Sequence, residues 1–502
     1  MSAPEPGPGH ADDRNDADAR ILGAGTYAPA ARLPREAVVE AWGRSRARGI
    51  DAVAVPAPDE DVLTMGVAAA ERALAAAGID ATDLAGLAFG TTTPPLAEED
   101  LLPRLGAALG APADARTHYA GRSTRAGTRA LRAARDASAF PALVVAADAP
   151  RAPPNSAEGH GAGAGAVAVV LGPVSGTGAA LVGDAEVSAD YPGTRFRRAG
   201  GDDGGVERLG VTAYDRTAFT RPIVAAVGVL GDDADAFDPA SAAALAVTAP
   251  DGDLPAHAAR AIGIAPEAVS TPVNALGDVG AAAPLLGLAA ALHDGVARTL
   301  VVGWGSGAGA DALLVDGVAP VEGQVGDGVG DARELSYTAA LRRRGEIASD
   351  DPPAGGGAAV SAPTWRRSIP ARYRLRAGRC PACDALVFPP EGACPDCRAL
   401  VDYESVRLPP AGVVETVTGV SPGGAPPEFA RQAERGGDYA VAIVRFEREG
   451  ARVSAPMQVA DADPDSVASG DLVRAVFRRI YVQEGVIRYG RKALPAAEDG
   501  DR

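Results

Sequence analysis

The first two thirds of the chain alternate short apolar runs with segments in which apolar residues recur every three to four positions. Short apolar runs are typical of buried strands, and the longer period is typical of helices that pack on a sheet. The pattern predicts strands at 21–27, 84–90, 142–147, 163–171, 244–247, 298–302 and 312–315, and helices at 62–77, 126–137, 215–230, 254–263 and 281–292. Strands that alternate with helices predict an α/β fold with buried sheets, and the return of the same rhythm suggests an internal duplication.

The pattern changes near residue 348. An arginine-rich amphipathic helix is predicted at 334–347, and the sequence DDPPAGGGA at 350–358 indicates a linker. Strand-like runs then follow at 412–420, 439–448, 452–460, 472–481 and 485–489, which suits a small β-barrel such as an OB-fold. We therefore expect a disordered acidic tail at 1–20, an α/β domain at 21–348, a linker at 349–361, a helix with a cysteine-bearing segment at 362–405, a barrel at 406–496 and an acidic tail at 497–502.

The cysteines form one cluster with metal-ligand spacing. The segment reads CPAC, ten residues, then CPDC, and its four cysteines are the only ones in the chain: Cys380, Cys383, Cys394 and Cys397. Two such knuckles complete a tetrahedral sulfur shell that suits Zn²⁺ and leaves no open position, so the predicted zinc is structural. The alternatives are two disulfides, which a reducing cytoplasm disfavours, or redox dithiols, for which a single pair suffices.

The excess of acidic residues and the near absence of lysine indicate the environment in which this protein works. The chain has 65 acidic and 48 basic residues, and Lys492 is its only lysine. An acidic surface with almost no lysine fits a salt-rich cytoplasm, and the alternative is a GC-rich genome that favours Ala, Gly, Arg and Pro codons. The N-terminal residues lack the basic and apolar regions of a secretory signal, and no apolar stretch is long enough to span a bilayer, so we expect a cytoplasmic protein.

The C-terminal part resembles a known family. The sequence WRRSIPARYRL at 365–375, the two knuckles, VFPP at 387–390 and IRYGRKALP at 487–495 are similar to the zinc-ribbon/OB-fold family that is associated with acyl-CoA enzymes. The resemblance covers about residues 362–496. It implies a module that binds or channels CoA and bridges subunits of the thiolase superfamily.

The N-terminal part resembles hydroxymethylglutaryl-CoA synthase, which implies a duplicated, layered thiolase-like fold. The similar segments are DEDVLTM at 59–65, GTTTPP at 90–95, GAGAV at 163–167, LLGLAAAL at 285–292, GWGSGAG at 303–309 and LSYTAALRRRG at 335–345. That family uses a cysteine thiolate to take the acyl group, a histidine and an asparagine to orient the second thioester, and a glutamate to move a proton.

The four catalytic positions of the family are replaced in this sequence. By local match the cysteine position falls on Thr124, the histidine position on Thr220, the asparagine position on Asp278 and the glutamate position on Thr92. No cysteine precedes Cys380, so the loss of the thiol does not depend on the match. A threonine hydroxyl without a base is a weak nucleophile, so we expect no catalysis from these positions.

A few residues outside these four positions are weaker candidates for acid/base catalysis or for binding a thioester. His118 is interpreted as a turn residue, and His160 and Asp215 are acid/base candidates at positions that are not catalytic in the family. The backbone of Gly305, Ser306 and Gly307 is a candidate donor set for a thioester oxygen, although the same sequence is equally compatible with a tight turn.

Three functions follow from these patterns. The first is a non-catalytic acyl-CoA-handling protein that docks a thiolase or synthase and forms a homo- or hetero-oligomer. The second is an active acyltransferase or condensing enzyme with a substitute residue. The third is a nucleic-acid-binding OB protein that uses Arg376, Arg379, Arg478 and Arg479, which the acidic charge and the scarcity of aromatic residues disfavour.

Overall fold

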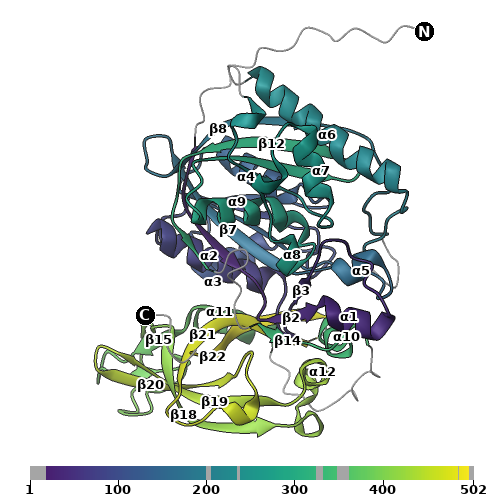
Figure 1. Cartoon of the computed structure of the whole chain (residues 1–502). Helices are drawn as coiled ribbons and strands as arrows, with labels where there is room; N and C mark the ends of the chain where they lie inside the picture. Colours follow the sequence, from purple (N-terminus) through teal and green to yellow (C-terminus); the bar gives the residue numbers. More distant parts are fainter. Residues whose placement is uncertain are drawn as a thin grey trace, which may run out of the picture.

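The computed structural model describes residues 19–198, 205–233, 238–323, 332–347, 361–483 and 485–496. The predicted linker up to residue 360, the tail at 497–502 and the first 18 residues lie outside these described residues. Ala19 and Arg20, which we expected in the N-terminal tail, instead begin strand β1. Figure 1 shows an α/β domain above and a C-terminal module below it.

The α/β domain is built from two halves with the same strand order. The first half runs β5-β4-β6-β7-β1 and the second runs β10-β9-β11-β12-β8, and β1 pairs with β8 to join them. In each half the first three strands are parallel and the next two are antiparallel. The strands are β1 (Ala19–Tyr27), β4 (Gly86–Gly90), β5 (Arg116–Ala120), β6 (Ala142–Asp148), β7 (Gly165–Pro173), β8 (Ala179–Val187), β9 (Ala244–Val247), β10 (Val269–Ser270), β11 (Arg298–Gly305) and β12 (Gly309–Asp316). The predicted duplication is confirmed.

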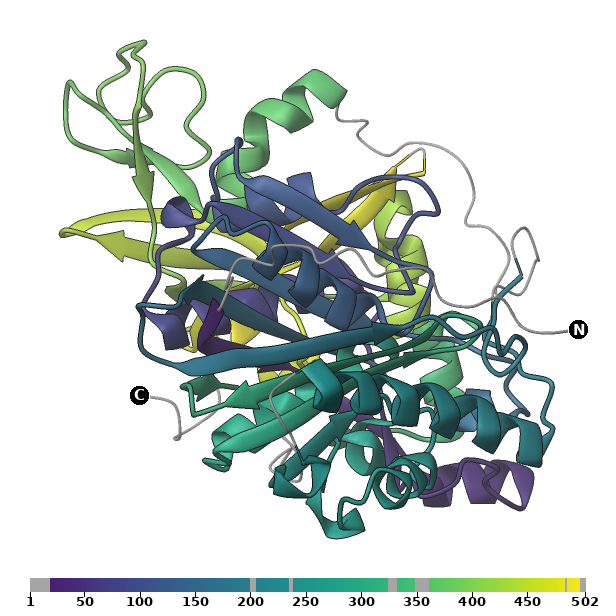
Figure 2. The same ribbon diagram turned by 90° about the horizontal axis from the view of Figure 1, so that it is seen from above.

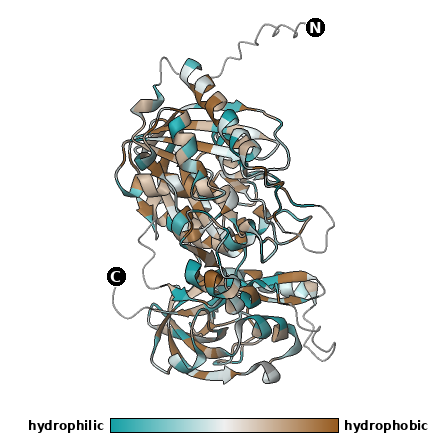
Figure 3. Cartoon of the chain, turned by 45° about the vertical axis from the view of Figure 1, so that its right-hand side comes forward, coloured by the Kyte–Doolittle hydropathy of each residue, from teal (hydrophilic) through white to brown (hydrophobic). Residues whose placement is uncertain are grey.

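Helices separate and cover the two halves. The larger helices are α2 (Val62–Ala77), α3 (Leu102–Leu109), α4 (Ala126–Asp136), α6 (Thr212–Asp233), α7 (Leu254–Ala261) and α9 (Ala283–His293). One buried cluster joins α4 and α9 to the inner faces of both halves, while α2 and α3 cover one outer face and α6 and α7 the other. Figure 3 shows the hydrophobic segments gathered on these internal strands and helices. The result is the layered thiolase-like fold that the resemblance implied.

Smaller elements complete the domain. They are β2 (Ala31–Pro34), α1 (Arg35–Trp42), β3 (Ala52–Val55), α5 (Ala157–Gly161), α8 (Val273–Leu276), β13 (Val321–Glu322), β14 (Arg333–Glu334) and α10 (Tyr337–Arg344). The helix predicted at 334–347 is wrong at both ends, because Ser336 caps α10 and Gly345 ends it in a left-handed conformation. Strand β5 was missed because four of its five residues are exposed and carry no apolar signal.

The C-terminal module consists of a helix, a ribbon and a barrel. Its elements are α11 (Ala362–Arg374), β15 (Arg376–Arg379), β16 (Leu386–Val387), β17 (Glu404–Arg407), β18 (Ala411–Val420), α12 (Pro427–Gly436), β19 (Tyr439–Arg448), β20 (Ala451–Gln458), β21 (Leu472–Gln483) and β22 (Val486–Pro495). The sheet order is β20-β19-β18-β21-β22, and a bridge from Val459 to Ala493 nearly closes it into a barrel. All five predicted barrel strands are confirmed, whereas α12 was missed. The ribbon extends away from the barrel in Figure 2.

The module packs against the α/β domain through a shared core. Trp365, Tyr373, Phe477 and Tyr489 belong to the same buried cluster as the apolar residues of α2 and α3. A continuous apolar core of this kind holds two domains in one arrangement. No helix in the described part of the chain is long and apolar enough to cross a membrane.

Candidate functional site

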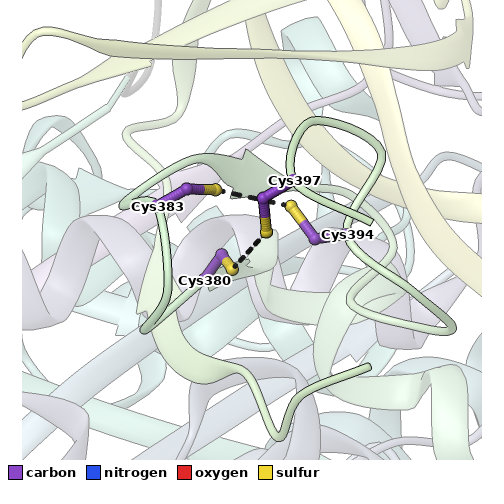
Figure 4. Close-up of side chains that lie close together, drawn as sticks. All are labelled: Cys380, Cys383, Cys394 and Cys397. Atoms are coloured by element: carbon purple, nitrogen blue, oxygen red, sulfur yellow. Dashed lines mark hydrogen bonds between the residues drawn. The ribbon is translucent and has the colours of Figure 1, made fainter. Parts of the chain in front are cut away.

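The four cysteines converge at the tip of the ribbon (Figure 4). Their sulfur atoms all lie within 4.8 Å of one another, with 3.7 Å between Cys380 and Cys397 and 3.6 Å between Cys383 and Cys394. A tetrahedral site with Zn–S bonds of ~2.3 Å has sulfur atoms about 3.8 Å apart, close to the two shorter distances, so the cluster suits Zn²⁺. The donor set of four thiolates closes the coordination shell, which marks the site as structural.

The two knuckles have the same backbone geometry. Asp384 N–H donates to Cys380 C=O at 2.8 Å, and Arg398 N–H donates to Cys394 C=O at 2.9 Å. Asp384 and Arg398 both have positive φ, 64° and 65°. Backbone hydrogen bonds, that from Cys397 foremost, lower the pKa of Cys394 to about 7, whereas burial and the neighbouring cysteines raise the pKa of Cys383 to about 12.

Thr124 lies just before α4, at the centre of the α/β domain. Its side chain is buried, and its hydroxyl donates to the Trp304 carbonyl at 2.5 Å. A Cβ added to Gly305 would lie 2.1 Å from Ser123 Oγ, so the two hydroxyl residues press against the end of β11. Within the described residues, the hydrogen bond of the Thr124 side chain goes to a backbone carbonyl and none joins it to an acid or a base.

A buried charge network lies beside Thr124 and was missed from the sequence. The Arg125 guanidinium donates to Asp311 at 2.5 and 3.0 Å and to Glu186 at 2.6 Å. Thr128 Oγ1 also donates to Asp311, at 2.7 Å. Both Arg125 and Asp311 are fully buried. These contacts hold the start of α4 against β12. The carboxylates of Asp311 and Glu186 balance the positive charge of Arg125.

Thr92 belongs to a loop that is held by Asp148, the last residue of β6. Asp148 is fully buried and accepts from the hydroxyls of Thr91, Thr92 and Thr93, the Thr92 contact being 2.8 Å. It also accepts from Ala281 N–H at 2.7 Å. Asp148 therefore joins the 90–95 loop to the loop before α9. The sequence carried one signal for it, since polar residues at the carboxyl end of a buried strand are frequent site residues.

Asp278 is buried and ion-paired. Its carboxylate accepts from the Arg195 guanidinium and from Gly280 N–H at 2.9 Å. Burial lowers the pKa of Arg195 to about 10, a value at which the guanidinium stays charged near neutral pH. The negative charge of Asp278 is thus compensated by Arg195.

Residues 191–197, which we call the strap, contact three of the segments described above: the 305–309 turn, the segment with Asp278 and the loop with Thr92. Tyr191 C=O accepts from Gly307 N–H at 3.0 Å, and Thr194 Oγ1 lies 2.9 Å from Ser306 Oγ. Further along the strap, Arg195 binds Asp278 and Arg197 donates to Thr92 C=O. The strap therefore ties three sequence-predicted segments together. One of the three candidate thioester donors, Gly307 N–H, is already engaged, and 305–309 is a tight turn between β11 and β12.

Thr220 is not brought to the other candidates by any described contact. It lies on α6, and its hydroxyl donates to Arg216 C=O one turn earlier. Exposed His118 lies on β5. His160 is buried between the rings of Trp42 and Tyr337, and burial lowers its pKa. Asp215, whose pKa burial raises, lies in the first turn of α6.

Two of the arginines considered for nucleic acids serve the domain interface instead. Arg478 is buried, 3.0 Å from Glu60 and 3.1 Å from Asp461. Arg479 donates to Pro58 C=O at 2.5 Å. Arg379, on the ribbon, pairs with Asp384 and Glu449. A nucleic acid would have to displace these partners.

Comparison with known proteins agrees with both parts of the chain. Residues 367–402 match the family model of the ChsH2 rubredoxin-like zinc ribbon domain. A DUF35 domain-containing scaffold protein of Methanocaldococcus jannaschii is 40% identical over 134 residues, which are 26% of this chain and 88% of that protein. The hydroxymethylglutaryl-CoA synthase of Pyrococcus horikoshii is 31% identical over 307 residues, 59% of this chain and 86% of the synthase.

Solved structures share the fold of the α/β domain. A crystal structure of an HMG-CoA synthase complexed with CoA superposes with a TM-score of 0.57 at 17% identity and covers 68% of this chain and 94% of that one. The strand order, the layers and the two sequence relationships point the same way. This chain belongs to the hydroxymethylglutaryl-CoA synthase family in its thiolase-like part and, fused to it, to the DUF35 scaffold family with its zinc ribbon.

Proposed function

We propose that this protein is a non-catalytic member of the synthase family that binds or channels CoA thioesters and docks a catalytic thiolase or synthase through its zinc-ribbon/OB module. One observation carries the proposal: the buried hydroxyl of Thr124, the residue that we propose at the family's cysteine position, donates to the Trp304 carbonyl. An alcohol becomes a nucleophile for thioesters only when a base removes its proton. The Thr124 hydroxyl donates to a backbone carbonyl, which is not a base that can remove the proton.

The contacts of Thr92 and Asp278 also support a protein without catalytic activity. Thr92 donates to Asp148, and Asp278 is paired with Arg195, so both are engaged in holding loops together. A carboxylate that is paired with a guanidinium is a poor general base, because the pair stabilises the ionised form and so weakens its ability to accept a proton. The α/β domain shares its fold with a synthase solved in complex with CoA, which supports retention of CoA binding.

The scaffold role rests on the fused module. The similar protein of M. jannaschii is named a scaffold protein. In this chain the equivalent module already packs on α2 and α3, which fixes its orientation relative to the synthase-like domain. We propose that its remaining surface receives a thiolase or synthase subunit.

Intact-mass spectrometry after incubation with acetyl-CoA tests catalysis, and a titration with CoA tests binding. We expect binding without a change in mass. The Thr124→Cys variant is the matched control, because an adduct in the variant alone would assign the inactivity of the natural chain to its hydroxyl. A stoichiometric acetyl adduct on Thr124 or Ser123 that Asp278→Asn abolishes would establish the alternative, an active acyltransferase.

Purification of the full chain from its native host tests docking. We expect a thiolase or a catalytic synthase to co-purify, identified by mass spectrometry, and condensing activity to appear only in that complex. Activity of the isolated chain equal to that of the complex would contradict the scaffold role.

A further inference from the structure

A cavity of about 420 Å³ lies where the C-terminal module meets the synthase-like domain. It is bounded by the segment before α2, by the 93–95 loop, and by residues of α10, α12 and β21. Six arginines line it: Arg151, Arg197, Arg343, Arg344, Arg435 and Arg479. Its volume falls within the range of ~300–1,000 Å³ that is typical of small-molecule sites.

The two carboxylates in the cavity wall are already engaged. Glu60 accepts from the Tyr27 hydroxyl and from Ala57 N–H, and it pairs with Arg478, which does not line the cavity. Asp61 accepts from the first N–H groups of α2 and, at 2.8 Å, from the Tyr489 hydroxyl. Of the lining arginines, Arg479 comes no nearer to Asp61 than 3.9 Å. The positive charge of the wall is therefore not cancelled by its own acids.

The guanidinium groups of three lining arginines, Arg151, Arg343 and Arg435, have no hydrogen bond or ion pair to any residue that the structure describes, although the charge of Glu346 acts on Arg151. Arg343 and Arg435 are partly buried. Burial lowers the pKa of both, and the charges of Arg151 and Arg479 lower the pKa of Arg435 further. Partly desolvated like charges destabilise one another, and an anion between them removes that cost.

The position of Arg435 on α12 is fixed by packing. A Cβ added to Gly345, the residue that ends α10, would lie 2.6 Å from the Arg435 guanidinium carbon. The guanidinium thus lies flat against a residue without a side chain, at the junction of α10 and α12. Arg343 lies on α10 only two residues before this glycine. Two guanidinium groups that have no partner among the described residues, one from each domain, therefore line the same cavity.

We infer that this cavity binds a small anion that bears phosphate groups with at least two negative charges. Guanidinium groups match phosphate oxygens with paired hydrogen bonds, and convergent arginines are the usual means of binding such anions. The inference goes beyond the proposed function, because it requires neither a thioester nor a partner subunit. The bound anion bridges α10 and α12, so it stabilises the docked arrangement of the two domains.

Calorimetric titration of the full chain with inorganic pyrophosphate tests the site. We expect saturable binding that weakens with increasing salt. Replacement of one unpaired arginine, in Arg435→Gln or Arg343→Gln, should weaken binding about tenfold. Arg342→Gln is the matched control, since Arg342 is the exposed neighbour of Arg343 and does not line the cavity. The Arg151→Gln variant repeats the test at an exposed position, where substitution leaves the fold intact.

Competition distinguishes the source of the phosphates. If CoA displaces pyrophosphate and 3′-dephospho-CoA does so less well, the site holds the nucleotide phosphates of CoA. If CoA does not compete, the site holds a free phosphate anion, and both results support the inference. Absence of saturable pyrophosphate binding, or an equal loss in Arg342→Gln, would overturn it. CoA binding that persists while pyrophosphate binding is absent would overturn this site alone and leave the proposed function standing.

Discussion

Lys492 Nζ lies 2.8 Å from Asp59 Oδ2, although the two residues are 433 positions apart. Lys492 is the only lysine of the chain, and its side chain is fully buried. Burial by itself raises the pKa of Asp59, but Lys492 and Arg478 lower it below its usual value. The pair therefore joins the last strand of the barrel to the segment before α2 as two opposite charges.

Removal of one charged partner of the Lys492–Asp59 pair should destabilise the folded protein. Lys492→Ala leaves Asp59 uncompensated in the interface and should lower the free energy of unfolding by about 3–5 kcal/mol. The double variant Lys492→Met/Asp59→Leu should recover most of that loss, because an apolar pair needs no compensation. The measurement is chemical denaturation. Arg452→Ala, which breaks the exposed pair with Glu447, is the control and should cost less than about 1 kcal/mol.

Glu60 makes stability depend on pH. Burial raises its pKa from an ordinary value of 4.5 to about 7, so between these values the folded chain binds a proton that the unfolded chain has lost. This contribution is complete below pH 4.5 and is lost as the pH rises to about 7, a change of about 3 kcal/mol. Denaturation curves at several pH values should show a steeper fall for the natural chain than for Glu60→Gln. Identical slopes for the two proteins would contradict this assignment.

Removal of one zinc ligand should unfold the ribbon. We expect one Zn²⁺ per chain by elemental analysis, and we expect Cys394→Ser to lose the metal and become sensitive to proteases near residues 380–402. Metal binding is worth about 10–16 kcal/mol in zinc-finger peptides, far more than a small ribbon gains from its core. Asp396→Asn changes the same knuckle without touching a ligand and should retain the zinc. A metal-free chain with a protease-resistant ribbon would refute the site.

The Thr124 hydroxyl should matter for stability rather than for chemistry. Thr124→Val leaves the buried Trp304 carbonyl without its donor, at a cost of about 1–3 kcal/mol in the free energy of unfolding. Thr124→Ser keeps the donor and should cost less. Neither variant should change the rate of acyl transfer, measured with acetyl-CoA, from that of the natural chain. A decrease in that rate with Thr124→Val would restore a catalytic role.

Salt should stabilise the chain if its acidity is an adaptation to a saline cytoplasm. Screening relieves repulsion among an excess of 17 negative charges, so the melting temperature should rise with KCl up to molar concentrations. A melting temperature that falls steadily with KCl would exclude the saline interpretation.

Local patterns determined much of this protein. The zinc ligands could be read from the sequence because all four lie between residues 380 and 397, where short-range turns alone bring their sulfur atoms together. The barrel strands and the two α/β halves were predictable because burial imposes a period on each element. Strand β5 was not predicted, because four of its five side chains are exposed and give no apolar pattern.

The tertiary structure decided how the candidate positions are used. That Asp148 holds three threonines, that Arg195 neutralises Asp278, and that Lys492 is buried against Asp59 cannot be read from spacing. Each of these contacts joins distant segments, and each polar group acquires its partner only when packing removes water around it. The sequence thus determined which residues are present at the site, whereas the fold decided which of them remain free to act.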